Sequence, residues 1–172
     1  MIALKHRFNN KQFSDEKINK SLSAILDSNV LLSMATIKNK KESYINTVYY
    51  AYSNSLNFYY LSPPTAEHSK NLEKNTSVAA SIFDSAQKIP TAKKSGLQIF
   101  GESRLAKGKE LLEGLSLCSS RYIWIVKYIK TPRDFFKKII ESKLYIIKPR
   151  SIKIFDEPTF GNEVWVTVSL QR

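Results

Sequence analysis

The sequence predicts a mainly β protein, an antiparallel barrel with flanking helices. Segments rich in β-branched and aromatic residues recur between short polar turns, a stretch of helical periodicity interrupts them, and more strand patterns follow it. A hydrophobic fraction of 42% over 172 residues is enough for one core without disulfides or a structural metal. A small barrel is favoured because it leaves few strand edges unpaired.

The chain divides into a polar leader, residues 1–13, and a single domain, residues 14–172. The leader is expected to be loosely ordered because it is polar and terminal. A helix is predicted over 15–28, since Ser14 can cap its first turn and apolar residues then recur at helical spacing.

Three strands are predicted next, over 30–37, 44–52 and 56–61. Each is rich in β-branched or aromatic residues, and short polar turns separate them. They are expected to form an antiparallel meander, in which each strand pairs with the next.

A short helix from Thr65 to Lys74 is predicted to follow, with Thr65 as its N-cap. Two more strands are predicted over 77–83 and 97–105, separated by a long loop. Gly101 lies in the middle of the second of these strands and indicates a bulge or a close approach of another backbone.

A helical insertion is predicted over about 107–142. Its first helix covers 107–118, and Thr131-Pro132 marks the start of another. Residues 121–130 fit either a helix or an alternating strand, and the helix is favoured. The last predicted strands cover 144–148, 152–155 and 163–168, the first two as short strands around Pro149.

Several classes of protein are excluded by composition and motifs. A single cysteine, Cys118, cannot form a disulfide framework, and two histidines are too few for a histidine-rich metal site. Neither a dinucleotide-binding glycine motif, nor a P-loop, nor a nucleophile elbow is present. The amino-terminal residues lack the apolar core of a signal peptide, and no apolar run is long enough to span a membrane. A cytoplasmic protein is expected.

The charge is unevenly distributed. The net charge is +12, and residues 119–153 hold 10 of the 27 lysines and arginines but only two acidic residues. Aromatic residues are interspersed with these cations, as in grooves that bind single-stranded nucleic acid. A solvated basic face is the simpler interpretation, and a non-catalytic module that binds nucleic acid or another anionic partner is the alternative.

Residues 59–75 are the most informative segment for function. A strand ends in hydroxyl and proline residues, and a short helix then carries His68, Ser69 and Lys70 in its first turns. Helix N-termini have free N–H groups and a partial positive charge, and Ser and Lys side chains add donors. The segment therefore indicates an anion site.

Residues 26–106 resemble the FMN-binding split-barrel family, the pyridoxamine 5′-phosphate oxidase-like proteins. The resemblance lies in the order of the segments VLLSMATI, YINTVYYAYS, LNFYYLSPPT, AEHSKNLEKN, SVAASIF and LQIFGESRL. Gln98-Ile99-Phe100-Gly101-Glu102 is similar to a recurring strand motif of the family, and the tail around 148–153 is similar to its final barrel strands.

The resemblance implies a Greek-key-like split barrel that forms a homodimer with FMN between the subunits. It also implies an oxidoreductase of an uncharacterised subgroup, which passes a hydride from a reduced nicotinamide, NAD(P)H, through FMN to a small-molecule substrate. True pyridoxamine-phosphate oxidases carry an arginine-rich substrate segment near the C-terminus. Here Arg172 is the only basic residue after Phe160, so that particular activity is not expected.

Matched position by position, the resemblance implies a set of cofactor contacts. They are Asn46, Thr47, Val48, Tyr59, Tyr60, Ser62, His68, Ser69, Lys70 and Gln98. One departure matters: many members carry Arg-Lys where this chain has Glu67-His68, and a carboxylate beside a phosphate is repulsive. Either Glu67 points away from the phosphate, or FMN binds weakly or not at all. Haem or a deazaflavin is a further alternative on the same fold, with His68 as the candidate iron ligand.

Overall fold

The computed structural model describes residues 4–8, 10–85, 94–122 and 141–170. Four helices and eight strands lie in these ranges: α1 (Asp15–Ser28), β1 (Leu31–Lys38), β2 (Glu42–Tyr49), β3 (Ala51–Tyr52), β4 (Phe58–Ser62), α2 (Glu67–Lys74), β5 (Ser77–Phe83), β6 (Ser95–Leu105), α3 (Lys109–Arg121), β7 (Lys143–Asp156), α6 (Glu157–Phe160) and β8 (Trp165–Ser169). Among these helices, none has the length and hydrophobicity that crossing a bilayer requires.

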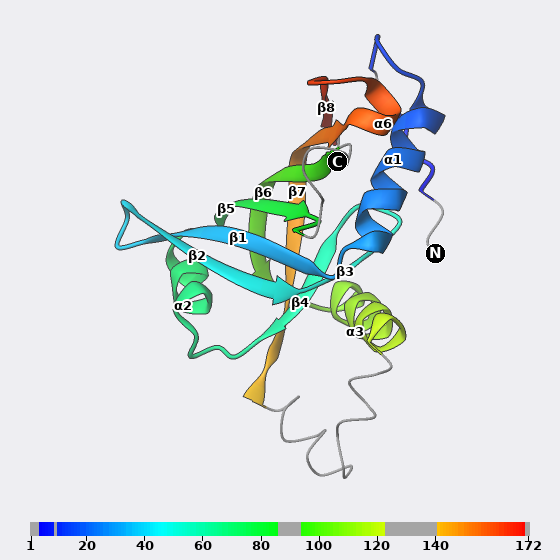
Figure 1. Ribbon diagram of the computed structural model, residues 1–172. Coiled ribbons are helices and arrows are strands. Elements are labelled where there is room, and N and C mark those ends of the chain that lie inside the picture. Colours follow the sequence, from blue (N-terminus) through cyan, green and yellow to red (C-terminus); the bar gives the residue numbers. More distant parts are fainter. Residues whose placement is uncertain (1–3, 9, 86–93, 123–140, 171–172) are drawn as a thin grey trace.

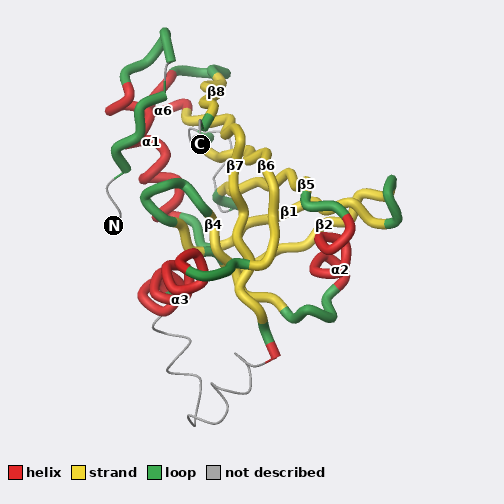
Figure 2. The backbone as a smooth tube through the Cα atoms, turned by 180° about the vertical axis from the view of Figure 1, so that it is seen from behind, coloured by secondary structure: helices red, strands yellow, loops and turns green. Residues whose placement is uncertain are grey.

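The strands form one antiparallel, strongly curved sheet, which confirms the predicted barrel-like fold class (Figure 1). Its strand order is β2-β1-β5-β6-β7-β4-β3, and β8 adds to β7. The helices pack against different parts of it. Helix α1 contacts β5 and β6, α2 contacts β1, β2 and β6, and α3 contacts β3, β4 and β7. Seen from behind, α1 and α3 lie on one side of the sheet and α2 at the opposite end (Figure 2).

The predicted meander is correct only in part. Strand β1 pairs with β2 as expected, and β3, the end of the second predicted strand, pairs with the third predicted strand, β4. The second predicted strand is nevertheless two strands, β2 and β3, and β4 also pairs with β7 on its other side. The chain breaks its strand at Tyr50, which is fully buried and whose hydroxyl donates to the carbonyls of Leu26 and Asn29, each at 3.0 Å. These hydrogen bonds hold Tyr50 against the end of α1. Strands β2 and β3, on either side of Tyr50, lie at opposite edges of the sheet.

The two short strands predicted around Pro149 are one strand, β7. It pairs with β4 up to Ile147 and with β8 from Ser151 onward. Pro149 lies between these two ladders, where its missing N–H removes no hydrogen bond to either of them. On the other side of β7, the register with β6 shifts between Phe100 and Gly101, which confirms the predicted bulge.

The leader packs more firmly than its composition suggests. Leu4 and Phe8 are buried in the main core, so the expectation of loose order is wrong for these two residues. The backbone N–H of His6 donates to Asn19 Oδ1, and the Asn19 amide donates back to the carbonyl of His6.

The predicted helical insertion is described only in its first part. Helix α3 extends to Arg121, beyond the predicted end at Cys118, and residues 123–140 lie outside the described residues.

Candidate functional site

The end of β4 and the first turn of α2 bring three predicted site residues together. Ser62 is the last residue of β4, and its Oγ lies 2.6 Å from His68 Nε2 and 3.3 Å from Ser69 Oγ. Ser62 and Ser69 are buried, and His68 is half-buried. The cluster forms because a turn closed by the Ala66 N–H and the Pro63 carbonyl folds α2 back onto the end of its own strand.

The start of α2 differs from the predicted start in its cap. The helix begins at Glu67 after Ala66, and no side chain caps it, so the assignment of Thr65 as the N-cap is wrong. The Pro63–Ala66 turn moves the first helical residue beyond the reach of Thr65. The first turn therefore keeps N–H groups that no side-chain cap satisfies, and these groups favour an anion.

Glu67 is directed toward β1. Its carboxylate lies 3.3 Å from Lys38 Nζ, and both side chains are more than a third exposed. Such an exposed pair contributes little to stability. The Lys38 ammonium nevertheless offsets the negative charge of Glu67, the charge that was expected from the sequence to repel a phosphate at the start of α2.

Burial lowers the pKa of His68 below its ordinary value of 6.5. The imidazole is therefore neutral at pH 7, and in the tautomer that leaves Nε2 unprotonated this atom accepts a hydrogen bond from the Ser62 hydroxyl. The cluster is thus a hydrogen-bonded hydroxyl–imidazole pair.

We expect this lowered pKa to appear in the pH dependence of stability. The unfolded chain takes up the His68 proton as pH falls through 6.5, whereas the folded chain takes it up only at lower pH. The free energy of unfolding should therefore fall with pH below 6.5, by at most about 1.4 kcal/mol per pH unit for one proton. Urea unfolding at several pH values should show a shallower slope for His68→Gln. Equal slopes would contradict the lowered pKa.

Strand β2 presents its predicted site residues on opposite faces. Asn46 and Thr36 share one face, because Asn46 pairs with Met34, two residues from Thr36. The Asn71 amide of α2 donates to Thr36 Oγ1 at 3.1 Å, so this is the face that α2 covers. Both side-chain polar atoms of Asn46 are buried without a hydrogen-bond partner. Val48 shares this face.

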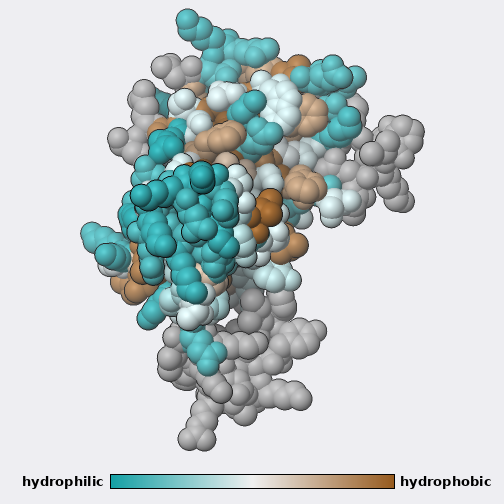
Figure 3. Space-filling view, turned by 90° about the vertical axis from the view of Figure 1, so that its left-hand side faces the viewer, coloured by the Kyte–Doolittle hydropathy of each residue, from teal (hydrophilic) through white to brown (hydrophobic). Residues whose placement is uncertain are grey.

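Thr47 and Gln98 lie on the other side of the sheet. Thr47 Oγ1 is 2.9 Å from Ser33 Oγ, and Gln98 pairs with Ser81 and Lys153. We call this side the outer sheet face. It exposes large hydrophobic side chains from five strands: Leu31, Ile45, Tyr49, Phe83, Phe100 and Trp165. Figure 3 looks onto the end that carries the β1–β2 turn and α2, and shows hydrophobic patches beside a hydrophilic surface.

The remaining predicted contacts in this part of the chain are Tyr59, Tyr60 and Lys70. Tyr59 is buried under α3, where its hydroxyl donates to Glu113 at 2.5 Å. Tyr60 lies in the main core, where its hydroxyl is 3.0 Å from Ser103 Oγ and its ring is 6.4 Å from that of His68. Lys70 is exposed on α2. Of the two tyrosines, only Tyr60 approaches the site.

The described part of the basic stretch is largely occupied by contacts within the protein. Arg121 donates to backbone carbonyls, Lys148 and Arg150 pair with Glu110 and Glu102, and Lys153 lies over the Trp165 ring. Most of the other cations in 119–153 fall outside the described residues. Binding of nucleic acid through this stretch therefore stays a prediction.

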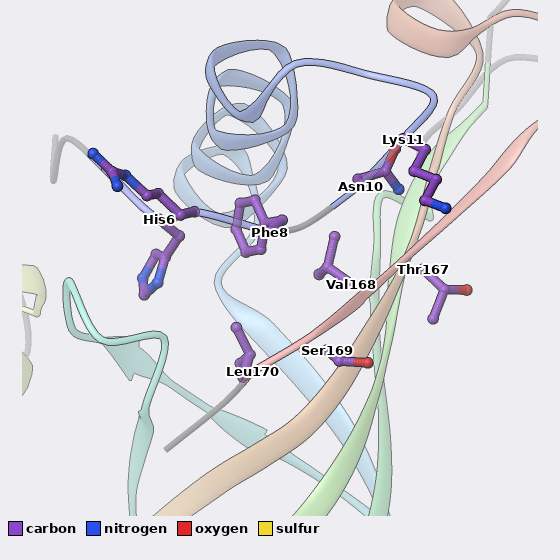
Figure 4. Close-up of a pocket in the computed structure, with 9 residues that line it drawn as sticks. His6, Phe8, Asn10, Lys11, Thr167, Val168, Ser169 and Leu170 are labelled. Carbon is purple, nitrogen blue, oxygen red and sulfur yellow. The ribbon is translucent and has the colours of Figure 1, made fainter.

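A cavity of about 570 Å³ lies between the amino-terminal segment and β8. Nothing in the sequence pattern predicts it. In Figure 4 the side chains of Val168 and Leu170 point toward Phe8, whereas Thr167 and Ser169 point to the other side of the strand. Its lining consists of His6, Arg7, Phe8, Asn10, Lys11 and residues 167–170.

No family model matches the chain, and neither does any curated protein. Solved structures do. A haem-binding protein from Mycobacterium smegmatis superposes with a TM-score of 0.67 at 15% identity, over 87% of this chain and 56% of that one. The haem storage protein HutZ from Vibrio cholerae gives 0.61 at 14%, over 76% and 88%. A Listeria innocua protein, provisionally assigned as a pyridoxamine 5′-phosphate oxidase, gives 0.58 at 16%, over 78% and 95%.

This chain has the pyridoxamine 5′-phosphate oxidase-like split-barrel fold. The resemblance in the sequence is therefore confirmed at the level of the fold. The split barrel spans just over half the length of the Mycobacterium protein, and nearly all of the Listeria protein. At these identities the likeness establishes the fold and leaves ligand and activity to be argued from the residues of this chain.

Proposed function

We propose that this split barrel is an FMN-binding flavoprotein. The observation that carries the proposal is the buried Asn46 amide, which has no hydrogen-bond partner. A buried polar group left without a partner costs about 1–3 kcal/mol, so its retention on the face covered by α2 is best explained by a ligand that bonds it. The FMN-binding resemblance selects the same residue independently.

The residues near Asn46 suit a flavin phosphate. The uncapped start of α2 offers N–H groups, the Ser69 hydroxyl adds a donor, and Lys70 adds a positive charge. Glu67 is paired with Lys38. We propose that these groups bind the phosphate and that Asn46 and Val48 contact the rest of the cofactor.

The flavin, when bound, supplies hydride transfer between a reduced nicotinamide and a small acceptor. The chain's own part is to bind and orient the cofactor and to exclude water. The lowered pKa of His68 keeps the imidazole neutral, and its hydrogen bond with Ser62 orients the ring beside the start of α2.

We further propose that two copies associate through the outer sheet face. The six hydrophobic side chains on this face are between 38% exposed (Phe100) and 70% exposed (Ile45). Such a group of exposed hydrophobic side chains on one face is unusual for a monomer. A polar row runs between them, with the Ser33–Thr47 hydrogen bond and Gln98 in it. Thr47 and Gln98 would then lie at the interface, so their contact with FMN depends on the second copy.

Binding of FMN to Asn46→Ala tests the proposal. We expect its affinity for FMN, measured by quenching of flavin fluorescence, to fall about fivefold or more, the loss of one hydrogen bond. In the absence of FMN the same change should leave the free energy of unfolding unchanged or raise it, because it removes an unpartnered buried amide. A structural asparagine would lose stability instead.

The matched control is Asn162→Ala, which removes an exposed amide in a distant turn. It should bind FMN like the wild type. The proposal is wrong if the wild-type protein does not bind FMN, or if the Asn46 and Asn162 variants bind it equally well.

Haem is the second candidate. Two structures of this fold are named as those of haem proteins, and His68 is neutral and half-buried. The Ser62 hydroxyl, however, lies 2.6 Å from the Nε2 that iron would need. A Soret band that disappears in His68→Gln would support haem over flavin.

A further inference from the structure

A second cavity lies on the side of α2 that faces away from Thr36 and Asn46. Glu67 and Asn71, spaced i and i+4, contact β1, whereas Ser69, Leu72 and Glu73 share a different helix face. The second group lines a cavity of about 330 Å³ between α2, the end of β6 and the start of β7. Its lining residues are Pro64, Ser69, Leu72, Glu73, Arg104, Leu105, Lys107, Lys143 and Tyr145.

The inner wall of this cavity is apolar and well fixed. Leu72 and Tyr145 are buried, and the Tyr145 ring stacks on Tyr60 with centroids 5.3 Å apart. Leu105 forms a further wall and leaves 41% of its surface exposed. An apolar body seated here would remove that surface from water, which is favourable in proportion to the area covered.

The rim is positively charged. Arg104 is held by Glu110 through two hydrogen bonds of 2.8 and 2.9 Å. Lys107 and Lys143 form no ion pair with any residue that the structure describes, so their ammonium groups are available to a ligand. Glu73 is the single acidic residue of the lining, and it favours one negative charge on the ligand over two.

We propose that this cavity binds a small monocarboxylate with an aromatic or branched apolar body. Its carboxylate lies between Lys107 and Lys143, and its body lies on Leu72, Leu105 and Tyr145. A volume of 330 Å³ is at the small end of ligand pockets, which suits a molecule of this size. The cavity shares Ser69 with the proposed phosphate site, but none of the contacts with Lys38, Thr36 or Asn46 forms part of it, and its test uses no FMN.

The buried end of the cavity is connected to the histidine cluster. Ser69 lines the cavity, its Oγ is 3.3 Å from Ser62 Oγ, and Ser62 in turn contacts His68. A ligand beside Ser69 should therefore change the environment of the His68 ring. Because the chain has only two histidines, His6 serves as an internal reference in proton NMR.

The probe is 3-phenylpropionate, titrated by calorimetry against its uncharged amide and against inorganic phosphate. We expect a Kd of about 1 mM or tighter for the carboxylate and at least about tenfold weaker binding of the amide and of phosphate. The Lys107→Met/Lys143→Met variant should lose about tenfold in affinity for the carboxylate. The His68 ring signal should shift on binding and that of His6 should not.

The matched control is Lys20→Met/Lys41→Met, which removes the same charge from exposed positions outside the cavity and should bind like the wild type. Thermal melting checks that both variants are folded. The proposal is wrong if the amide or phosphate binds as tightly as the carboxylate, if both double variants lose the same affinity, or if His6 shifts as much as His68.

Discussion

Replacing Gly101 by alanine is expected to destabilise the protein by at least about 3 kcal/mol. A Cβ at this position would lie 2.7 Å from Pro149 Cα and 2.9 Å from the carbonyl carbon of Lys148. Both are backbone atoms of the paired strand, so no side-chain rotation can relieve the overlap. The bulge also sets the register of β6 on β7, and β7 in turn pairs with the strand that carries Ser62.

Urea unfolding of Gly101→Ala measures this loss. Gly108→Ala is the control, because its φ of 54° strains a side chain but nothing lies within 4 Å of the added Cβ. With ψ at −125° its backbone lies outside the left-handed helical region, so this strain alone should cost about 1–3 kcal/mol. A Gly101→Ala loss no larger than that of Gly108→Ala would contradict the close approach of the two strands.

Replacing Arg121 by methionine is expected to cost about 3 kcal/mol. Its guanidinium donates to the carbonyls of Leu26 and Asn29, each at 2.6 Å, at the C-terminal end of α1. It also lies over the rings of Tyr50 and Tyr52, 4.9 and 5.4 Å from their centroids. Hydrogen bonds to a charged group contribute about 1.5–3 kcal/mol each, and stacking adds to them.

Arg121→Lys separates charge from geometry. Lysine keeps the positive charge at the end of the helix but lacks the planar fork, so about half of the stability should return. The measurement is again urea unfolding. If Arg121→Met is within about 0.5 kcal/mol of the wild type, Arg121 does not join α3 to α1.

The elements predicted well from the sequence are those with strong local signals. Helix α1 has the predicted bounds, and β5 coincides with the strand predicted over 77–83, because a cap and a strand pattern need only nearby residues. The bulge at Gly101 was indicated by a single glycine inside a strand pattern. The order of such segments was sufficient to indicate the split barrel.

The elements that were missed are decided by distant contacts. Residues on both sides of Tyr50 favour strand equally, and the break depends on the carbonyls of Leu26 and Asn29. In the sequence, Pro149 indicates the end of a strand. Strand β7 nevertheless continues through Pro149, because the strand that pairs with β7 changes from β4 to β8 at that point. Neither fact is visible in local sequence.

For the candidate site, the sequence indicated the segment but not the direction of each side chain. Ser62, His68 and Ser69 were predicted and lie together. Tyr59 and Tyr60 are adjacent in β4, so they point to opposite sides, and only the fold decides which of them faces α2. The cavity rimmed by Lys107 and Lys143 had no signal in the sequence, because its walls come from three separate segments.

The central claim, a flavin site on this split barrel, is tested most directly by the absorption spectrum of the purified protein before and after incubation with FMN and desalting. The visible bands of a flavin, retained after desalting and weakened in Asn46→Ala, are the predicted result. A spectrum without flavin bands after incubation, or a Soret band in their place, would contradict the claim.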